Sequence, residues 1–487
     1  MLIQSGVFFC YFCLVFCVTW LTPRSLRWLP LLAASFLFVA YGHPWHLLFL
    51  GLPTLVVYGA ARRMAALPLE AKKARKRWLL AAVALTLGAL IAVKYVNFFM
   101  GTVAGAASLF GAGWNWRPLK TLLPIGISFY TVRLLGYLID VYFGRIPAER
   151  HAGRFALFSS FFPQVSAGPI ERAGRFLPLL KNPETFSSER IFSGACQVAW
   201  GFFKKLVIAD RLAIFVDPVF ADPQGQGLNL IFAAWLYAFQ IYCDFSGYTD
   251  IAIGLARMLG YESAPNFNRP YLSTGVADFW SRWHISLSTW LRDYLFLPVS
   301  YAVMRPLKQD RFLGIKVESW AYTAAALLTM TLCGLWHGPT WAFVFWGTLH
   351  GFFMIVGQLG RKRRRRWARK VGLSSRPALH RALRVALTFN LVSLAWIFFR
   401  APTLAKAFEY LHFVQLKPNW TGWNFLLVNS LLVLLLIAAE RPAAKRERPG
   451  LWKRLPLPLR SALLALFVCL TILFSMDAGN EFIYIQF

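Results

Sequence analysis

The sequence predicts an all-α integral membrane protein whose chain crosses the bilayer many times. Hydrophobic residues make up 57% of the 487 residues and charged residues only 15%, and the mean hydropathy is +0.50. A soluble domain of this length needs fewer apolar residues to fill its core. Apolar stretches recur from Val7 to Ser475 without a long polar domain between them, so we expect a single polytopic membrane domain over residues 1–487.

Apolar segments follow one another along the whole chain. They lie at Val7–Leu21, Leu29–Tyr41, Leu47–Ala60, Trp78–Met100, Thr121–Phe143, Ile191–Phe215, Leu228–Leu259, Ala321–Trp336, Trp341–Leu359, Ala382–Phe399, Phe425–Ala439 and Ser461–Ser475. Several are shorter than the ~20 residues that a perpendicular transmembrane helix requires. We therefore expect some of them to be tilted, interfacial or re-entrant.

The positions of lysine and arginine predict how the chain is oriented. Loops rich in these residues alternate with loops that are poor in them. The basic loops contain Arg24 with Arg27, Arg62–Arg77, Arg145–Arg190, Arg257–Lys316, Arg361–Lys370 and Arg441–Arg460, and the other loops are Gly101–Lys120, Val216–Gly227 and Pro402–Asn424. Because positively charged loops resist translocation, the basic loops should be cytoplasmic and both termini should lie outside.

The net charge of +31 comes from the same basic loops. The cations lie in short runs between apolar segments and not on one polar module, so the sequence excludes a nucleic-acid partner and favours membrane lipid. The seven cysteines lie mostly inside apolar segments without a second pair of ligands, so we expect no metal. The N-terminus lacks a basic region and a small-residue cleavage site, and its apolar stretch is interpreted as a retained span.

Two stretches on the predicted cytoplasmic side are too long and too apolar to be plain loops. Phe155–Leu180 and Pro270–Ser300 are rich in aromatic residues and leucine, and proline and glycine interrupt both. Irregular backbone at membrane depth must be shielded by protein or must line a wet cavity. We therefore expect these two stretches to dip into the bilayer and to form the walls of an internal chamber.

The first cluster of ionisable residues lies in the second of these stretches. Trp280, His284, Ser288 and Leu291 recur at helical spacing, which predicts that they share one helix face. His284 is either a functional residue or a structural histidine with a hydroxyl partner. Trp283 and Ser288 are candidates for the lining of a substrate tunnel. Asp293 either orients a neighbouring group there or forms an ion pair with an arginine.

The second cluster surrounds His337 at a glycine- and proline-containing turn between two apolar segments, and His350 follows it. Such a turn places a titratable imidazole where one helix ends and the next begins. Trp336, Trp341 and His350 are further candidates for the tunnel, and packing or interface anchoring is the alternative for the tryptophans. From the predicted topology, His337 lies near the outer side and His284 nearer the cytoplasm, at opposite levels of one cavity.

Two imidazoles in one cavity fit acyl transfer across the membrane. A neutral histidine removes the proton of an acceptor hydroxyl while that hydroxyl attacks a thioester, and His337 is the candidate for this base. It can equally carry the acyl group for a time. Basic residues on the cytoplasmic side can hold the phosphates of a coenzyme, or they are positive-inside charge alone. These candidates are Arg282, Arg292, Arg305 and Lys308.

Both histidine clusters, and further motifs along the chain, resemble the membrane-bound O-acyltransferase (MBOAT) family. The resemblance is to the bacterial branch that contains the membrane subunit of alginate O-acetyltransferase. The most specific matching pieces are Phe279–Leu297 and Leu335–Thr340. The other pieces are Lys94–Phe99, Leu123–Thr131, Tyr137–Tyr142, Ala167–Arg172, Asp244–Gly254, Asn268–Tyr271, Trp396–Arg400 and Phe482–Phe487.

The resemblance implies a ring of helices around a central funnel or tunnel, with a core at roughly 121–400, and it implies that His337 and His284 are the two active-site histidines. It also implies acetyl-CoA as the cytoplasmic acyl donor and an extracytoplasmic partner similar to SGNH hydrolases. The acceptor is then a polysaccharide, either alginate, as in alginate biosynthesis, or another exopolysaccharide or envelope polymer. The expected location is the bacterial cytoplasmic (inner) membrane.

Other functions remain open at this point. The related exporters transfer D-alanine from a carrier protein to a cell-wall polymer. A secondary transporter also has buried polar residues and broken helices, but the chain shows no repeated half-pattern. A scaffold for other envelope enzymes predicts that His337 is dispensable. The sequence does not reveal the polymer, the partner and its stoichiometry, the number of transmembrane helices or the oligomeric state.

Overall fold

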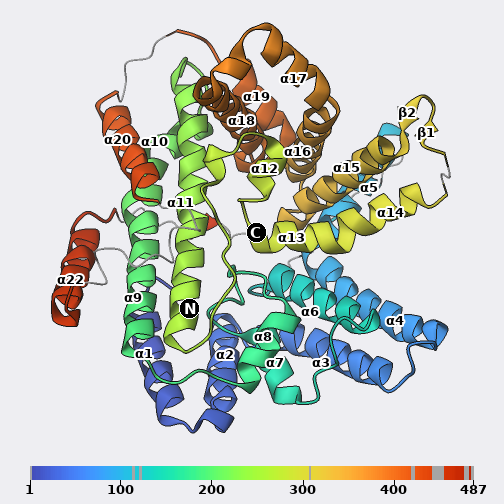
Figure 1. Cartoon of the computed structure of the whole chain (residues 1–487), viewed down its shortest axis with the longest axis vertical. Helices are drawn as coiled ribbons and strands as arrows, with labels where there is room; N and C mark the ends of the chain where they lie inside the picture. Colours follow the sequence, from blue (N-terminus) through green and yellow to red (C-terminus); the bar gives the residue numbers. More distant parts are fainter. Residues whose placement is uncertain are drawn as a thin grey trace. The chain divides into compact units, whose positions relative to one another are not determined.

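The computed structural model describes residues 3–111, 114, 116–119, 123–306, 309–417, 423–440, 455–476 and 482–483. Within these ranges the regular structure is helical apart from one two-stranded hairpin (Figure 1), which confirms the all-α class. Lys308 and most of the predicted loop Arg441–Arg460 lie outside the described residues. The predicted ring around a funnel stays a prediction.

The chain divides into two compact units. The first consists of the residues up to Val198 together with Tyr248–Ala264, and the second consists of Ala199–Gly247 and Pro265–Ile483. Helices α9 and α11 each contribute to both units, because the division falls within them. The expected single membrane domain stays a prediction.

The first unit contains the N-terminal helices. They are α1 (Gly6–Leu21), η1 (Arg24–Leu26), α2 (Trp28–Gly42), α3 (Trp45–Ala65), α4 (Lys72–Leu90), the π-helical turn η2 (Ile91–Tyr95), α5 (Val96–Leu109), α6 (Ile127–Tyr142), α7 (Ala152–Ser160), α8 (Ala173–Lys181) and the first part of α9 (Ser188–Phe202). The last turns of α11 (Asn229–Met258) complete it.

The predicted stretch Phe155–Leu180 is the core of the first unit. It folds as α7, an irregular turn and α8, and the rings of Phe158 and Phe161 are fully buried in it. The buried Arg133 of α6 donates from Nη1 to the carbonyl of Phe158 at 2.9 Å. Because a buried carbonyl needs a donor wherever no regular helix supplies one, this arginine stabilises the irregular backbone. The broken backbone is as predicted, and its depth in a membrane stays a prediction.

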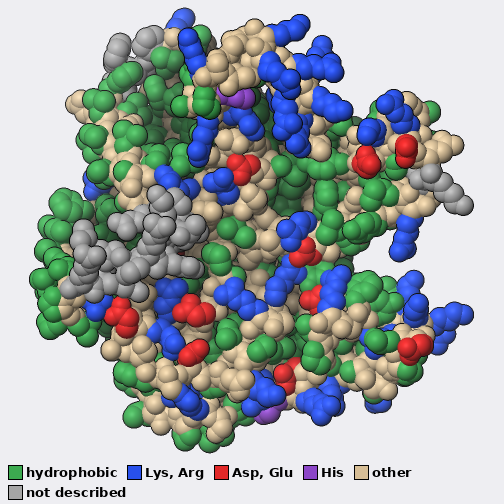
Figure 2. Space-filling view, in the orientation of Figure 1, with side chains coloured by type: hydrophobic (Ala, Val, Ile, Leu, Met, Phe, Trp, Pro, Cys, Tyr) green, Lys and Arg blue, Asp and Glu red, His purple; other side chains and the backbone are tan. Residues whose placement is uncertain are grey.

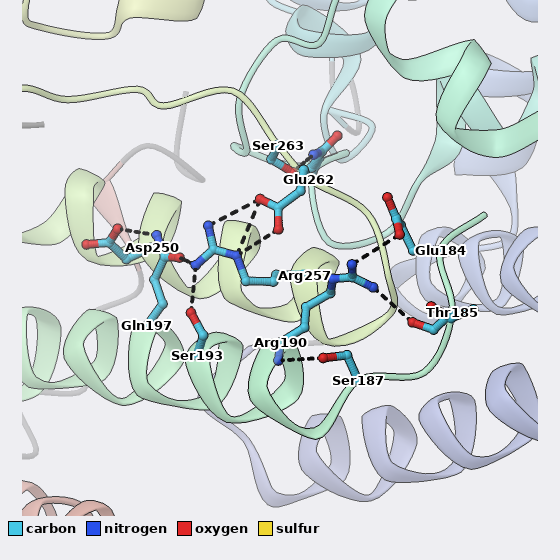
Figure 3. A network of polar contacts seen from close by, with 11 residues as sticks. Glu184, Thr185, Ser187, Arg190, Ser193, Gln197, Asp250, Arg257, Glu262 and Ser263 are labelled. Carbon is cyan, nitrogen blue, oxygen red and sulfur yellow. Dashed lines mark hydrogen bonds and ion pairs between the residues drawn. The ribbon is translucent and has the colours of Figure 1, made fainter. Parts of the chain in front are cut away.

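A network of side-chain contacts joins the parts of α9 and α11 that belong to the first unit (Figure 3). Arg257 of α11 lies at its centre and donates to Gln197 Oε1 at 2.8 Å and to Ser193 Oγ at 3.3 Å on α9. Its Nε also forms an ion pair with Glu262 at 3.1 Å. Gln197 in turn donates to Asp250 at 2.9 Å. Three side-chain hydrogen bonds therefore fix the last turns of α11 against α9.

The second unit contains the remaining elements. They are the π-helical turn η3 (Phe203–Ala209), α10 (Asp210–Ala221), η4 (Pro270–Leu272), α12 (Val276–Trp280), α13 (Ile285–Leu291), the π-helical turn η5 (Arg292–Phe296), α14 (Leu297–Met304), β1 (Arg311–Phe312), β2 (Ile315–Lys316), α15 (Val317–His337), α16 (Trp341–Leu359), α17 (Arg361–Lys370), η6 (Leu373–Ser375), α18 (Pro377–Arg400), α19 (Leu404–His412), α20 (Trp423–Ala439) and α22 (Leu457–Leu473).

The hairpin is a short antiparallel pair with Arg311 opposite Lys316 and Phe312 opposite Ile315. Its two-residue turn has positive φ at Leu313 and Gly314, at 50° and 76°. Two consecutive left-handed residues are what a tight hairpin turn requires.

Each of the twelve apolar segments predicted above contains a helix, as expected. In the described part of the chain, six helical stretches are long and apolar enough to cross a membrane: Arg24–Gly42, Trp45–Ala65, Lys72–Leu109, Ser188–Ala221, Trp341–Leu359 and Pro377–Arg400. Gly6–Leu21, Trp423–Ala439 and Leu457–Leu473 are shorter apolar helices. These three lengths agree with the expectation that some apolar segments are too short for a perpendicular span.

A buried ion-pair network connects four elements of the second unit. Lys205 in η3 lies 2.8 Å from Asp244 Oδ1 on α11 and 3.0 Å from Asp210 Oδ1 on α10, and the three side chains are at most 7% exposed. The second oxygen of Asp244 accepts the backbone N–H of Ile483 at 2.8 Å. One lysine therefore holds α10 and α11 together, and Asp244 also binds the C-terminal segment.

We expect Lys205→Met to destabilise the second unit. Removing the ammonium leaves two carboxylates buried without their cation, which costs about 3–5 kcal/mol. The melting temperature of the purified protein in detergent measures the effect. Lys406→Met is the control, because it breaks an exposed ion pair with Glu409 whose loss costs only about 0–1 kcal/mol. Equal melting temperatures for the two variants would contradict this account.

Candidate active site

The backbone bends sharply at His284, between α12 and α13. His284 has φ 43° and ψ 54°, which is the left-handed region, and its side chain is fully buried. Asn266 holds this bend from the side. Its carbonyl accepts the N–H of Ile285 at 2.9 Å, and its Oδ1 accepts the hydroxyl of Ser286 at 2.8 Å. Asn266 therefore supplies the partners that the broken helix cannot supply itself.

The prediction of one continuous helix face through the first cluster is wrong. Trp280 ends α12, and α13 begins only at Ile285. A residue with positive φ cannot continue a right-handed helix, so His284 and Ser288 do not follow Trp280 on one helical face. The hydroxyl of Ser288 instead donates to the carbonyl of Trp283 at 2.9 Å. Histidine tolerates the left-handed region better than most residues, but spacing alone does not reveal such a break.

His337 is the last residue of α15 and is 2% exposed. Its ring centre lies 5.1 Å from that of Trp346 and 5.5 Å from that of Phe399. The ring centre of His284 is 6.5 Å away. The two predicted catalytic imidazoles therefore lie beside one another, and the expectation that they occupy opposite levels of a cavity is wrong.

His350 joins α16 to the segment that carries His284. Trp280 donates its indole N–H to His350 Nδ1 at 3.2 Å, and the His350 ring stacks on Phe279 at 6.1 Å with an interplanar angle of 13°. Because Nδ1 is an acceptor here, the neutral ring carries its proton on Nε2. His350 is thus fully buried and can donate a hydrogen bond from Nε2. It lies four residues after Trp346 on α16.

Aromatic side chains enclose the histidines. Trp283, Trp346 and Trp396 are fully buried. The ring of Phe245 on α11 meets that of His284 edge-on at 4.7 Å and 90°. Burial lowers the pKa of the His284 imidazole, because an apolar environment disfavours its charged form. The neutral form of His284 is therefore favoured, and it offers one hydrogen-bond donor and one acceptor.

The other predicted tunnel residues differ in exposure. Trp336 is half-buried and touches His337 at a ring distance of 4.9 Å. Trp341 begins α16 and is 54% exposed, so it lies at the surface end of the turn that follows His337. Asp293 forms an ion pair with Arg292 at 2.9 Å, which is the alternative that the sequence left open.

Two of the four predicted phosphate-binding cations have carboxylate partners. Arg282 pairs with Asp278 at 2.8 Å. Partial burial raises the pKa of Asp278, but hydrogen bonds from the backbone N–H of Thr274 and from Arg282 outweigh it, so the pKa lies below its usual value. Arg292 pairs with Asp293. Arg305 is exposed, and Lys308 lies outside the described residues.

Two glycines set the distance between the helices that carry His337 and Trp346. A Cβ on Gly334 of α15 would lie 2.2 Å from the carbonyl oxygen of Phe343, and one on Gly347 of α16 would lie 2.1 Å from that of Met330. Any side chain at either position forces α15 and α16 apart. This close approach was missed in the sequence, although both glycines stand within or beside the second cluster.

Comparisons with known proteins show which family the chain resembles. The family model described as "MBOAT, membrane-bound O-acyltransferase family" matches residues 151–400, a range that includes His284, His337 and His350. A probable alginate O-acetylase of Azotobacter vinelandii is 36% identical over 425 residues, which cover 86% of this chain and 79% of that protein. One of Pseudomonas putida is 33% identical over the full length of both chains. A peptidoglycan O-acetyltransferase of Helicobacter pylori is 32% identical, covering 69% of this chain and 64% of its own.

We expect Gly347→Ala to lower the melting temperature of the purified protein. The added methyl group overlaps the carbonyl of Met330, and such overpacking costs typically about 1–3 kcal/mol. Gly357→Ala is the matched control, because it lies in the same helix and a Cβ there meets nothing within 4 Å. A Gly347→Ala protein as stable as the Gly357→Ala protein would show that α15 and α16 are not in close contact.

Proposed function

Because the chain belongs to the membrane-bound O-acyltransferase family, we propose that it passes an acetyl group from cytoplasmic acetyl-CoA across the membrane for O-acetylation of an extracytoplasmic polysaccharide. The chain is an acyltransferase and a multi-pass membrane protein. One observation supports the proposal most directly, namely that His284 and His337 are buried with their ring centres 6.5 Å apart.

The acceptor class is proposed from the relatives. Those in Azotobacter and Pseudomonas are named for alginate, and that in Helicobacter is named for peptidoglycan, so each name describes acetylation of a polysaccharide. The higher identities belong to the alginate enzymes, at 36% and 33%. We therefore infer an alginate-like exopolysaccharide or another envelope polymer as the final acceptor.

In the proposed reaction His337 acts as the general base. Its neutral imidazole takes the proton of an acceptor hydroxyl while the hydroxyl oxygen attacks the thioester carbonyl. A C–O bond forms, the C–S bond breaks, and the leaving thiolate receives the proton from His337. The site is lined by indole and phenyl rings, which exclude water and so protect the thioester from hydrolysis.

His284 has a supporting part in this proposal. Burial favours the neutral form of its imidazole, and the ring centre lies 6.5 Å from that of His337. The bend at His284 directs that ring toward His337 and away from the path a continuous helix would take. His284 then orients the acceptor hydroxyl or the acyl carbonyl, and His350 keeps the α12 segment in place through Trp280.

The donor is proposed to enter from the cytoplasmic side, where its phosphates meet Arg282, Arg292, Arg305 and Lys308. The first two already have carboxylate partners, so a phosphate must compete with Asp278 and Asp293 for them. Both ion pairs are partly exposed, and exposed ion pairs stabilise weakly, by about 0–1 kcal/mol. Exchange of a carboxylate for a phosphate is therefore feasible at these two arginines.

The proposed location is the bacterial inner membrane, with both termini on the extracytoplasmic side. The alternation of basic loops supports this orientation. An extracytoplasmic partner similar to SGNH hydrolases is proposed to complete the transfer onto the polymer, and Trp341, which is exposed beside the His337 turn, lies on that side in this topology.

We expect His337→Ala to abolish acetylation of the envelope polymer, with a loss of at least the 10²–10⁴-fold that a general base contributes. The measurement is the acetate released by mild alkali from cells that express the variant, with its membrane level confirmed by immunoblot. His412→Ala is the control, because His412 is exposed on α19. Full acetylation in the His337→Ala cells would overturn the assignment.

The donor is tested with purified protein in lipid vesicles. We expect added acetyl-CoA to be consumed with release of free thiol when acceptor and partner protein are present, and His337→Ala to stop this release. Release only with an acyl-loaded carrier protein would indicate D-alanyl or similar transfer instead. Uptake of a solute without any thioester cleavage would favour a transporter and would reject the proposed reaction.

A further inference from the structure

Helix α17 carries the densest positive charge of the described chain. Eight of its ten residues are arginine or lysine, and every residue in it except Ala368 is exposed. Figure 2 shows this charge as a dense group of lysine and arginine side chains over the part of the molecule where α17 lies, and no acidic side chain interrupts it on the face that is drawn.

No carboxylate balances this charge among the described residues. The chain has no aspartate or glutamate between Glu318 and Glu409, and no side chain of α17 takes part in an ion pair within the described ranges. Arg364 has internal partners, since it donates to the carbonyls of Val356 and Gly357 at the end of α16. Like charges one helical turn apart repel one another, so α17 needs anions from outside the chain.

The position of α17 indicates where those anions are. It follows α16 through Gly360 and leads through η6 into α18. Both α16 and α18 are long and apolar enough to cross a membrane, and they pack against each other. A short helix between two such neighbours lies where both leave the bilayer, at the level of the lipid headgroups.

Apolar residues in and beside α17 also fit a position at the level of the lipid headgroups. Trp367 is 60% exposed, Val371 four residues later is 49% exposed, and Leu359 before the helix is 52% exposed. Tryptophan is enriched at the boundary between hydrocarbon and water. A helix with cations on most of its surface and a tryptophan on the remaining edge is typical of a segment that lies in the membrane interface.

We propose that α17 is a binding surface for the headgroups of anionic phospholipids. The arginine guanidinium groups pair with the lipid phosphates, while Trp367 is inserted beside the acyl chains. Each basic residue near an anionic membrane surface adds to the attraction, so several lipids are held next to α16 and α18. This surface is independent of the acyl transfer proposed above and does not require it.

The test uses full-length protein purified in an uncharged detergent and mixed with micelles that contain equal amounts of phosphatidylglycerol and phosphatidylcholine. The lipid that stays with the protein after gel filtration is then quantified. We expect phosphatidylglycerol to be enriched, and we expect the enrichment to fall at least tenfold in the variant R361Q/K362Q/R363Q/R365Q/R366Q. Arg364 is kept because it binds the end of α16.

Two further variants separate charge from fold. The variant R361K/R363K/R365K/R366K keeps the positive charge and should keep most of the enrichment. In the wild-type protein, high salt should weaken the enrichment of phosphatidylglycerol. The matched control is K72Q/K73Q/K76Q/R77Q, which removes four exposed cations from the start of α4 and should leave the enrichment within twofold. Unchanged enrichment in the glutamine variant of α17, or an equal loss in the α4 variant, would overturn the proposal.

The phosphates of a soluble nucleotide share the chemistry of the lipid headgroup, so one arm distinguishes these two sources. Coenzyme A is added to the wild-type protein with its bound phosphatidylglycerol. We expect the lipid to stay bound. Displacement of the lipid by micromolar coenzyme A, together with loss of coenzyme A binding in the glutamine variant, would reassign α17 to the acyl donor and would reject the lipid surface.

Discussion

The bend of the backbone at His284 is the constraint on which the rest of the site depends. A left-handed residue at this point costs about 1–3 kcal/mol and is stable only because Asn266 accepts hydrogen bonds from the residues that follow it. The bend ends α12 and begins α13, and it brings the His284 ring within 6.5 Å of His337. If one continuous helix ran through this position, the His284 side chain would point in a different direction. In enzymes, backbone strain of this kind clusters at active sites, which supports the role proposed for His284.

Close packing of α15 against α16 is the second requirement. Gly334 and Gly347 allow the two backbones to touch, and Trp346 is then able to lie against His337. Trp346 stacks in turn on Trp396 of α18 at 5.5 Å. The aromatic enclosure of the histidines is therefore assembled from several helices at once. Its geometry is rigid because each ring is held by at least one other ring.

Two of the three π-helical turns in the described residues carry buried lysines. Lys94 lies in the π-helical turn η2 of the first unit and donates to Ser128 at 3.1 Å. Lys204 and Lys205 lie in the π-helical turn η3 of the second unit, where Lys205 holds two carboxylates. A π-helical turn inserts one extra residue and so rotates the side chains that follow it. The two turns thus direct charged groups into the protein, where partners satisfy them, and away from lipid.

The sequence by itself determined the class of the protein and the residues most worth examining. Apolar composition and the spacing of twelve apolar segments predicted the helices, because a chain in lipid must satisfy its backbone polar groups within each segment. The residue motifs carried the family resemblance, and His337 was already the preferred base. The helices follow from periodicity, which is a local property, whereas the choice of His337 rests on the second histidine cluster and on the family resemblance.

Only the tertiary structure decided how those residues meet. The break at His284, its support by Asn266 and the contact between Gly334 and Gly347 depend on atoms far apart in the chain. The pairing of Arg282 and Arg292 with neighbouring carboxylates, and the closeness of His284 to His337, also required coordinates. Helical spacing cannot foresee a residue in the left-handed region, because hydrogen bonds and packing from other segments stabilise it there.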